Sequence, residues 1–96
     1  MQFLVLAYDG NDPEAQDRRM AARPDHLAAA AKLKREGRII AGGAILDDND
    51  LMIGSTLYVD FPSKEELDEW LNNDPYVTGG VWQEITVKPI RLAIKD

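Results

Sequence analysis

The stretch that decides the fold is Gln2-Phe3-Leu4-Val5-Leu6-Ala7-Tyr8, which is followed by the turn residues Asp9-Gly10. A run rich in Phe, Leu and Val that stops at such a turn predicts a β-strand. Both alternating sets of its side chains are apolar: Phe3, Val5 and Ala7 form one set, and Leu4, Leu6 and Tyr8 form the other. A strand with one face in water alternates apolar with polar residues. We therefore expect both faces of this strand to be covered.

Two further strands are predicted over residues 38–47 and 51–61. They flank the turn-forming residues Asp47-Asp48-Asn49-Asp50 and should pair as an antiparallel hairpin. These carboxylates do not have the spacing of an EF-hand, which needs a Glu at position twelve, so we interpret them as a solvated turn. Gly42, Gly43 and Gly54 lie inside the two strands, where glycine indicates a bulge or the close approach of a backbone or a ligand.

The region between the first two strands is predicted to be helical in two pieces. Asp12-Pro13 pairs an N-cap residue with proline, which favours a helical segment over residues 13–22. Pro24 is expected to interrupt this segment, because the residue before a proline is disfavoured in the α conformation. A second helical segment is predicted from Asp25 to Glu36, and Gly37 is expected to cap its end.

The second half of the chain predicts one more helix and one more strand. Ser63 and Glu66 match the S-x-x-E capping box, and the helix that follows carries apolar residues at the spacing of one buried face. The last strand is predicted over residues 82–94, where Pro89 favours an edge, a bend or a bulge. The order is therefore β-α-β-β-α-β.

This order of elements predicts a ferredoxin-like α+β fold. We expect a four-stranded antiparallel sheet with both helices on one face, in a single domain of residues 1–96. Within 96 residues nothing is left to cover the second face of the first strand. We therefore expect a homodimer in which two sheets pack face to face, as a dimeric α+β barrel.

Composition excludes several classes of function. The chain has no cysteine, which removes disulfides, thiolate nucleophiles and iron–sulfur clusters, and its single histidine disfavours a catalytic zinc site. We expect no metal and no cofactor. A formal net charge of −6 argues against nucleic acid as a partner. No apolar run approaches the roughly 20 residues of a membrane span, and no signal peptide is visible, so we expect a cytoplasmic protein with no membrane partner.

One ionisable residue lies in phase with the apolar stripe of each predicted helix. His26 precedes Ala29, Ala30 and Leu33 at the offsets +3, +4 and +7, and Asp74 follows Leu67 at the offset +7. If both helices pack on one face of the sheet, imidazole and carboxylate can meet, and the carboxylate would fix the tautomer of a general base. Two simpler interpretations stay open: His26 as a hydrogen-bonded core residue, and Asp74-Pro75 as the N-terminus of a further helical turn.

Four motifs together resemble the YciI-like family of small bacterial proteins across essentially the whole chain. They are Phe3-Leu4-Val5-Leu6-Ala7-Tyr8-Asp9-Gly10, Arg23-Pro24-Asp25-His26-Leu27, Gly42-Gly43-Ala44 with Gly54-Ser55, and Asp74-Pro75-Tyr76. The resemblance implies a dimeric α+β barrel with an active site built on a His–Asp pair, which maps onto His26 and Asp74. Related barrels include muconolactone isomerases, cofactor-independent oxygenases and haem-binding proteins, and elimination chemistry on chlorinated aromatics is reported for some YciI-like members. Gly43-Ala44 departs from the Gly-Pro of many relatives.

Our first hypothesis is a cofactor-independent enzyme that uses His26, oriented by Asp74, as a general acid/base. Its substrate would be a small cyclic or aromatic metabolite, such as a lactone or hydroxyquinone, and its reaction an isomerisation or an elimination. The candidate substrate contacts are Arg23, Tyr8, Ser55 and Tyr76, with Arg23 either pairing with a substrate anion or forming an ordinary surface ion pair. The alternative is a non-catalytic small-molecule-binding or protein-interaction module with a structural His–Asp pair.

Overall fold

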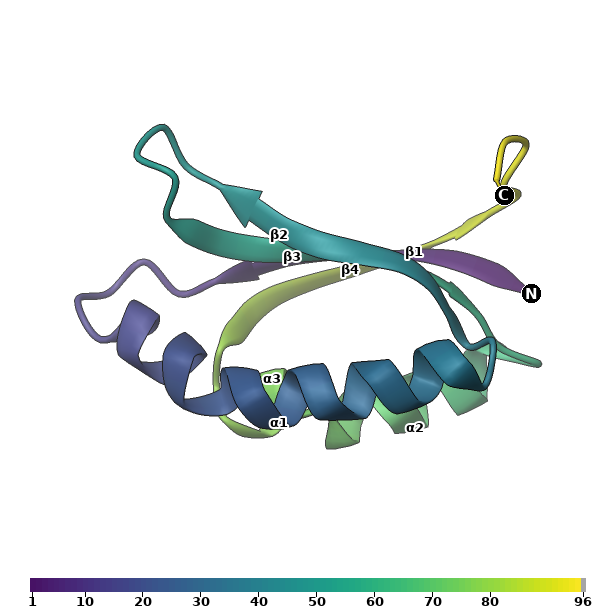
Figure 1. The fold of residues 1–96 in the computed structure, drawn as a ribbon, viewed down its shortest axis with the longest axis horizontal. Coiled ribbons are helices and arrows are strands. Elements are labelled where there is room, and N and C mark those ends of the chain that lie inside the picture. Colours follow the sequence, from purple (N-terminus) through teal and green to yellow (C-terminus); the bar gives the residue numbers. More distant parts are fainter. Residues whose placement is uncertain (96) are drawn as a thin grey trace.

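A computed structural model describes residues 1–95 and has the expected ferredoxin-like α+β fold, with the helices packed on one face of a four-stranded antiparallel sheet (Figure 1). The strands stand in the order β2-β3-β1-β4. Their bounds are β1 Gln2–Asp9, β2 Ile39–Leu46, β3 Met52–Asp60 and β4 Trp82–Ile90. The helices are α1 Ala15–Arg35, α2 Lys64–Asn73 and α3 Pro75–Thr78. No helix within residues 1–95 combines the length and the apolar character that crossing a membrane requires.

The first strand lies in the middle of the sheet, paired with β3 on one side and β4 on the other. Its Phe3, Val5 and Ala7 side chains face the helices and are at most 2% exposed. The alternate set faces away from the helices, where Tyr8 is 40% exposed. The expected cover is therefore present on one face of β1, while the other face is open in a single chain.

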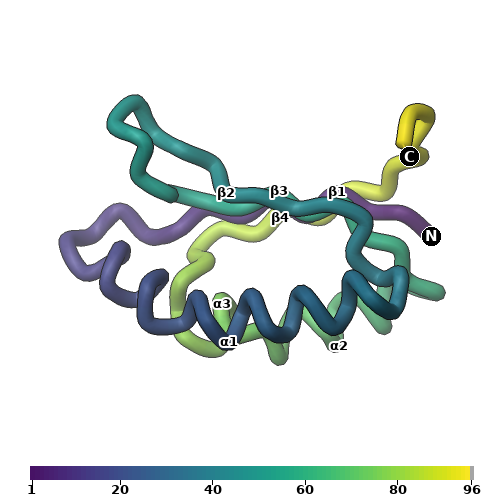
Figure 2. Tube along the Cα trace, viewed as in Figure 1, coloured from purple at the N-terminus to yellow at the C-terminus, as the bar shows by residue number. Residues whose placement is uncertain are grey.

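Helix α1 is continuous, so the break expected at Pro24 is wrong. Proline removes only one hydrogen bond, from its own nitrogen to the Met20 carbonyl, and a helix can bend at such a point without ending. Figure 2 shows the axis of α1 changing direction in its first half. The continuity matters for function, because Arg19 and His26 then lie two turns apart on one face of one helix.

The start of α1 also differs from the expectation. The helix begins at Ala15, and Asp12 is not its N-cap. The Asp12 carboxylate instead accepts two hydrogen bonds from the Arg18 guanidinium, at 2.8 and 2.6 Å. These hydrogen bonds hold the pKa of Asp12 well below its usual value. The Asp12 side chain thus binds Arg18 and makes no cap hydrogen bond to α1.

The remaining strand predictions are confirmed, except that β4 ends at Ile90 and not at residue 94, because its partner β1 begins at Gln2, which pairs with Ile90. Strands β2 and β3 form the antiparallel hairpin, with register irregularities between Ile39 and Ala41 and between Ile45 and Leu46. Pro89 lies in β4, which is an edge strand and needs no second ladder of hydrogen bonds. At Gly54 a Cβ atom would stand 2.5 Å from the Ala7 carbonyl oxygen, so this position has no room for a side chain.

Ser63 caps helix α2 as expected. Its Oγ accepts a hydrogen bond from the Glu66 backbone nitrogen at 3.2 Å. The reciprocal bond from the Glu66 side chain to the Ser63 backbone, which would complete the capping box, is not formed within residues 1–95.

Replacing Ser63 by alanine should lower the free energy of unfolding by about 1 kcal/mol, because one N–H at the start of α2 loses its acceptor. Urea denaturation measures this loss. Ser63→Asp keeps an acceptor at the same place and serves as the control, so it should retain the stability. Equal stability of the alanine and aspartate variants would show that the cap contributes nothing.

Candidate active site

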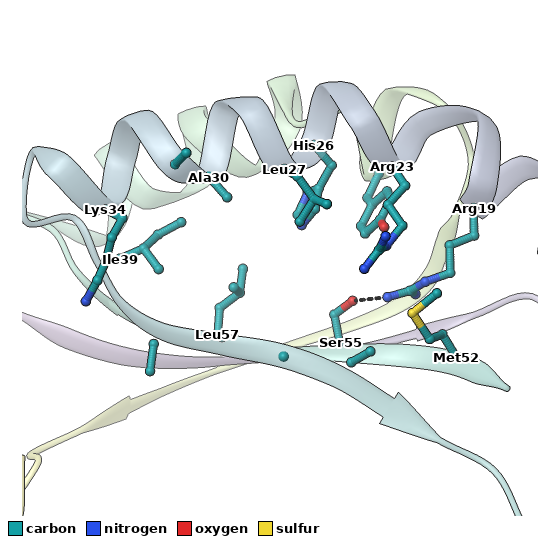
Figure 3. Close-up of a pocket in the computed structure, with 16 residues that line it drawn as sticks. Arg19, Arg23, His26, Leu27, Ala30, Lys34, Ile39, Met52, Ser55 and Leu57 are labelled. Atoms are coloured by element: carbon teal, nitrogen blue, oxygen red, sulfur yellow. Dashed lines mark hydrogen bonds between the residues drawn. The ribbon is translucent and has the colours of Figure 1, made fainter. Parts of the chain in front are cut away.

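A cavity of about 450 Å³ lies between helix α1 and the strands β2 and β3 (Figure 3). Its lining is mostly apolar, and all of its polar side chains except Lys34 gather toward one end. That end is formed by Arg19, Arg23, His26, Ser55 and Tyr76. A concave apolar cavity with a few convergent polar groups is the usual form of a small-molecule site.

His26 and Asp74 are hydrogen-bonded, with imidazole Nδ1 2.8 Å from carboxylate Oδ2. The two groups therefore meet, as their shared helical phase allowed. The side chains are 8% and 0% exposed, so the contact is shielded from water. An ionised carboxylate only accepts hydrogen bonds, so Nδ1 must carry the hydrogen. In the neutral ring, Nε2 then holds the free lone pair at the cavity wall.

The same Asp74 oxygen also caps the short helix α3. Oδ2 accepts a hydrogen bond from the Tyr76 backbone nitrogen at 2.9 Å, and Pro75 occupies the first helical position. The cap and the imidazole contact are therefore not alternatives, because one oxygen serves both. The backbone of α3 holds the carboxylate in place, and the carboxylate holds the imidazole. The other oxygen, Oδ1, is buried and has no hydrogen-bond partner among residues 1–95.

Two aromatic rings fix the plane of the imidazole. Tyr76 stacks on His26 with ring centroids 3.8 Å apart and planes 9° from parallel. Trp82 meets the imidazole edge-on at 5.7 Å. With the hydrogen bond to Asp74, these contacts leave the imidazole little freedom to rotate.

A buried ion pair supports the same end of the cavity. Arg19 Nη1 lies 2.9 Å from Asp9 Oδ1, and the two side chains are 3% and 2% exposed. The guanidinium also lies over the Tyr76 ring, with its carbon 4.9 Å from the ring centroid. Arg19 and His26, two turns apart on α1, thus contact the same aromatic ring.

Ser55 is held as a hydrogen-bond donor toward the cavity. Its Oγ accepts one hydrogen bond from Arg19 Nη2 and one from Trp82 Nε1, both at 3.1 Å. A hydroxyl has two acceptor lone pairs and one hydrogen. Since both lone pairs are engaged, the hydrogen remains for a bound ligand, and the cation of Arg19 strengthens it as a donor.

The cavity is a local region of positive charge in an acidic chain. Arg23 lines it and forms no ion pair within residues 1–95, and no Asp or Glu lines it. Burial raises the pKa of the Tyr76 phenol, although the charges of Arg19 and Arg23 act in the opposite direction. The phenol therefore keeps its proton at neutral pH and can donate a hydrogen bond. An anionic, planar ligand suits this set of groups best.

The structure brings together most of the residues that the sequence singled out, with one correction. Tyr8 does not line the cavity. Side chains alternate along a strand, and because Ala7 faces the helices, Tyr8 must face the opposite side of the sheet. Arg19 and Asp9 were missed. The signal for Arg19 was the spacing Arg19, Arg23, His26, which the assumed break at Pro24 concealed, and no sequence signal pointed to Asp9. Within residues 1–95 no group of three His, Cys, Asp or Glu side chains is placed to hold a metal ion.

Comparison with known proteins gives likenesses that span nearly the whole chain. A model of the YCII-related domain family matches residues 1–91. Protein YciI of Escherichia coli O6:H1 is 35% identical over 97 residues, covering 95% of this chain and 97% of that protein. Aspercryptin biosynthesis cluster protein B of Emericella nidulans is 31% identical over 88 residues, covering 84% of this chain and 55% of that protein.

A solved structure is similar in both sequence and fold. It is 5-chloro-2-hydroxyhydroquinone dehydrochlorinase from Burkholderia phenoliruptrix, in complex with 2,5-dihydroxybenzoquinone. The TM-score is 0.81 at 30% identity, and the likeness covers 95% of this chain and 94% of that one.

Proposed function

The chain belongs to the YCII-related domain family, and from this premise we propose that it is an enzyme that acts by general acid/base catalysis on a small anionic cyclic or aromatic metabolite. The observation that carries the proposal is the His26–Asp74 hydrogen bond beside a cavity that holds cations and no carboxylate. The similar dehydrochlorinase, in complex with a dihydroxybenzoquinone, supports the substrate class.

In the proposed reaction, Nε2 of His26 removes a proton from a carbon next to a substrate carbonyl. The electron pair of the broken C–H bond moves to the carbonyl oxygen, which becomes an enolate oxygen. Return of the proton to a different carbon gives an isomer. Departure of a leaving group with its bonding pair completes an elimination instead. Both outcomes are redox-neutral, so the proposed chemistry draws on no electron carrier.

The negative charge that develops on the enolate oxygen needs donors around it. Ser55 and Tyr76 supply hydroxyl hydrogens, and Arg23 supplies an unpaired cation at the same end of the cavity. Donors held in place before the reaction stabilise such a charge without further rearrangement. These three residues are the proposed substrate contacts, and His26 with Asp74 is the proposed catalytic pair.

Turnover tests the proposal. The purified protein is incubated, without added cofactor, with chlorinated hydroxyhydroquinones, hydroxyquinones and unsaturated lactones, and mass spectrometry reads both binding and conversion. We expect conversion of at least one class with no change in oxidation state. Binding without conversion would favour a non-catalytic binding module. The absence of both binding and conversion would contradict the proposal.

We also propose that two copies pack through the open face of the sheet. This face carries Leu4, Leu6, Tyr8, Ile45 and Tyr58, among which Tyr8 and Tyr58 are 40% and 37% exposed. These apolar side chains of β1, β2 and β3 favour association, while β4 adds polar residues such as Lys88, which pairs with Leu4, at the edge of the same face.

Sedimentation should therefore detect a homodimer at micromolar concentration, with a buried area above about 1,200 Å² in total. Tyr58→Lys places a charge in the middle of the open face and should shift the equilibrium toward monomer. Lys64→Glu, on the helix side, is the control and should leave the dimer intact. A wild-type chain that sediments as a monomer at every concentration would contradict the proposal.

A further inference from the structure

The cavity extends well beyond its catalytic end. Its lining on helix α1 runs from Arg19 through His26 to Lys34. At 1.5 Å per residue, His26 and Lys34 are about 12 Å apart along the helix axis. This length exceeds that of a single six-membered ring with its substituents. Figure 3 shows Lys34 at the opposite end from Arg23, with Ala30, Ile39 and Leu57 between them.

The middle of the cavity is lined by apolar side chains, several of which are small. Ala30 and Ala31 line it from the helix, and Ala41 and Gly42 line it from β2. A Cβ atom at Gly42 would stand 2.5 Å from Leu57 Cδ2, because the Leu57 side chain already occupies the space beside this glycine. The result is an apolar channel between the helix and the sheet, open to solvent along Ala31 and Ala41, which suits a chain of methylene groups.

A cation stands at the far end of this channel. Lys34 Nζ donates one hydrogen bond to the Ile40 carbonyl oxygen at 2.7 Å, which ties the side chain across the end of the channel from α1 to β2. An ammonium has three hydrogens, so two remain for a ligand. No Asp or Glu lines the cavity to neutralise this charge.

We propose that the substrate carries an extended apolar arm with a terminal carboxylate, in addition to the reacting ring. The ring lies at the His26 end, the arm follows the channel past Ala31, and the carboxylate pairs with Lys34. This inference rests on the proposed function, since it places the reacting part of the substrate at His26. It narrows the substrate class to anionic molecules that are charged at both ends.

Ligand binding measured by calorimetry tests the arm separately from catalysis. The probes are 2,5-dihydroxybenzoquinone, its 3-alkyl derivatives of increasing chain length, and the same derivatives with a terminal carboxylate. Each buried methylene should tighten binding about threefold to fourfold. The carboxylate should tighten it further at the chain length that reaches Lys34. Equal affinity for the parent ring and all its derivatives would overturn the inference and leave the proposed function standing.

Two variants with matched controls locate the arm. Ala31→Leu fills the channel and should abolish the gain from the alkyl arm while preserving binding of the parent ring. Ala28→Leu makes the same change at an exposed position of α1 that does not line the cavity, and should change nothing. Lys34→Met should remove the gain from the carboxylate alone, and Lys32→Met, outside the lining, should not. Retention of both gains in the two channel variants would contradict the inference.

A parent ring that does not bind would count against the proposed function, and the arm is then tested alone. Dodecanedioate carries a carboxylate at each end of a methylene chain and needs no reacting ring. It should bind to the wild type and to Ala28→Leu, and bind at least tenfold more weakly to Ala31→Leu and Lys34→Met. Failure of dodecanedioate to bind the wild type would overturn the inference in that case as well.

Discussion

Replacing His26 by alanine is expected to lower turnover by about 10²-fold to 10⁴-fold, the contribution of a positioned general acid/base. The group that takes the proton is lost together with its stacking contact with Tyr76, while Asp74 still caps α3 through the Tyr76 backbone nitrogen. Steady-state kinetics on the substrate found by the conversion screen measure the effect. The loss should appear in kcat, with little change in the chain's circular dichroism.

Asp74→Asn separates orientation from folding. An amide oxygen still accepts the hydrogen bond of the Tyr76 backbone, so α3 should keep its cap. The amide cannot serve as an anionic partner for the imidazole, so turnover should fall with it. If the pair were only structural, both variants would mainly lose stability, by about 1–3 kcal/mol for an unsatisfied buried group. Unchanged kcat in a folded His26→Ala protein would remove the proposed catalytic pair.

Replacing Asp9 by asparagine should produce the largest loss of stability, about 3–5 kcal/mol, because it leaves the buried charge of Arg19 without its partner. The loss is a large part of the roughly 5–15 kcal/mol that stabilises a typical domain. Chemical denaturation measures it. Asp68→Asn breaks the exposed Lys64–Asp68 pair, whose side chains are each 47% exposed. That control should cost about 0.5 kcal/mol or less.

A double variant tests the physical cause of this loss. Asp9→Asn with Arg19→Met removes both charges, and should be more stable than Asp9→Asn alone because no unpaired charge remains buried. A double variant that is less stable than the single one would assign the loss to packing against Tyr76. Turnover of the double variant is not used in this test, because Arg19→Met also removes one of the two hydrogen-bond donors to Ser55.

Periodicity and turn residues were sufficient for the order of the four strands and the two longer helices and for the ferredoxin-like topology, whereas α3 was only an open alternative. Turns and caps, such as the turn at Asp47–Asp50 and the cap at Ser63, are determined by neighbouring residues. The apolar periodicity shows which face of each helix and strand must be buried. The sequence predicted a break at Pro24 because the conformational preference before a proline is also local. Packing of both halves of α1 on the same sheet overrides that preference and leaves only a bend.

The candidate site was predictable where a helical phase pointed to it and not where tertiary contacts decide. His26 and Asp74 were found from their offsets on two helices, and Arg23, Ser55 and Tyr76 from their motifs. Tyr8 was predicted as a substrate contact because it lies in a motif of the YciI-like family, but the motif does not show which face of β1 its side chain occupies. Asp9 looked like a turn residue, and only the folded chain brings it to Arg19. The burial of the Asp9–Arg19 ion pair depends on the whole fold and not on the local sequence.

The hydrogen bond between His26 and Asp74 joins positions 48 residues apart. Strands β2 and β3 and helix α2 lie between them along the chain. Helical turns form within about a microsecond from neighbouring residues, whereas contacts between distant segments wait until the intervening chain has been arranged. During refolding, the helical signal of α1 should therefore return before the imidazole has its partner. Circular dichroism would report when α1 forms, and recovered activity would report when the complete fold has brought His26 and Asp74 together.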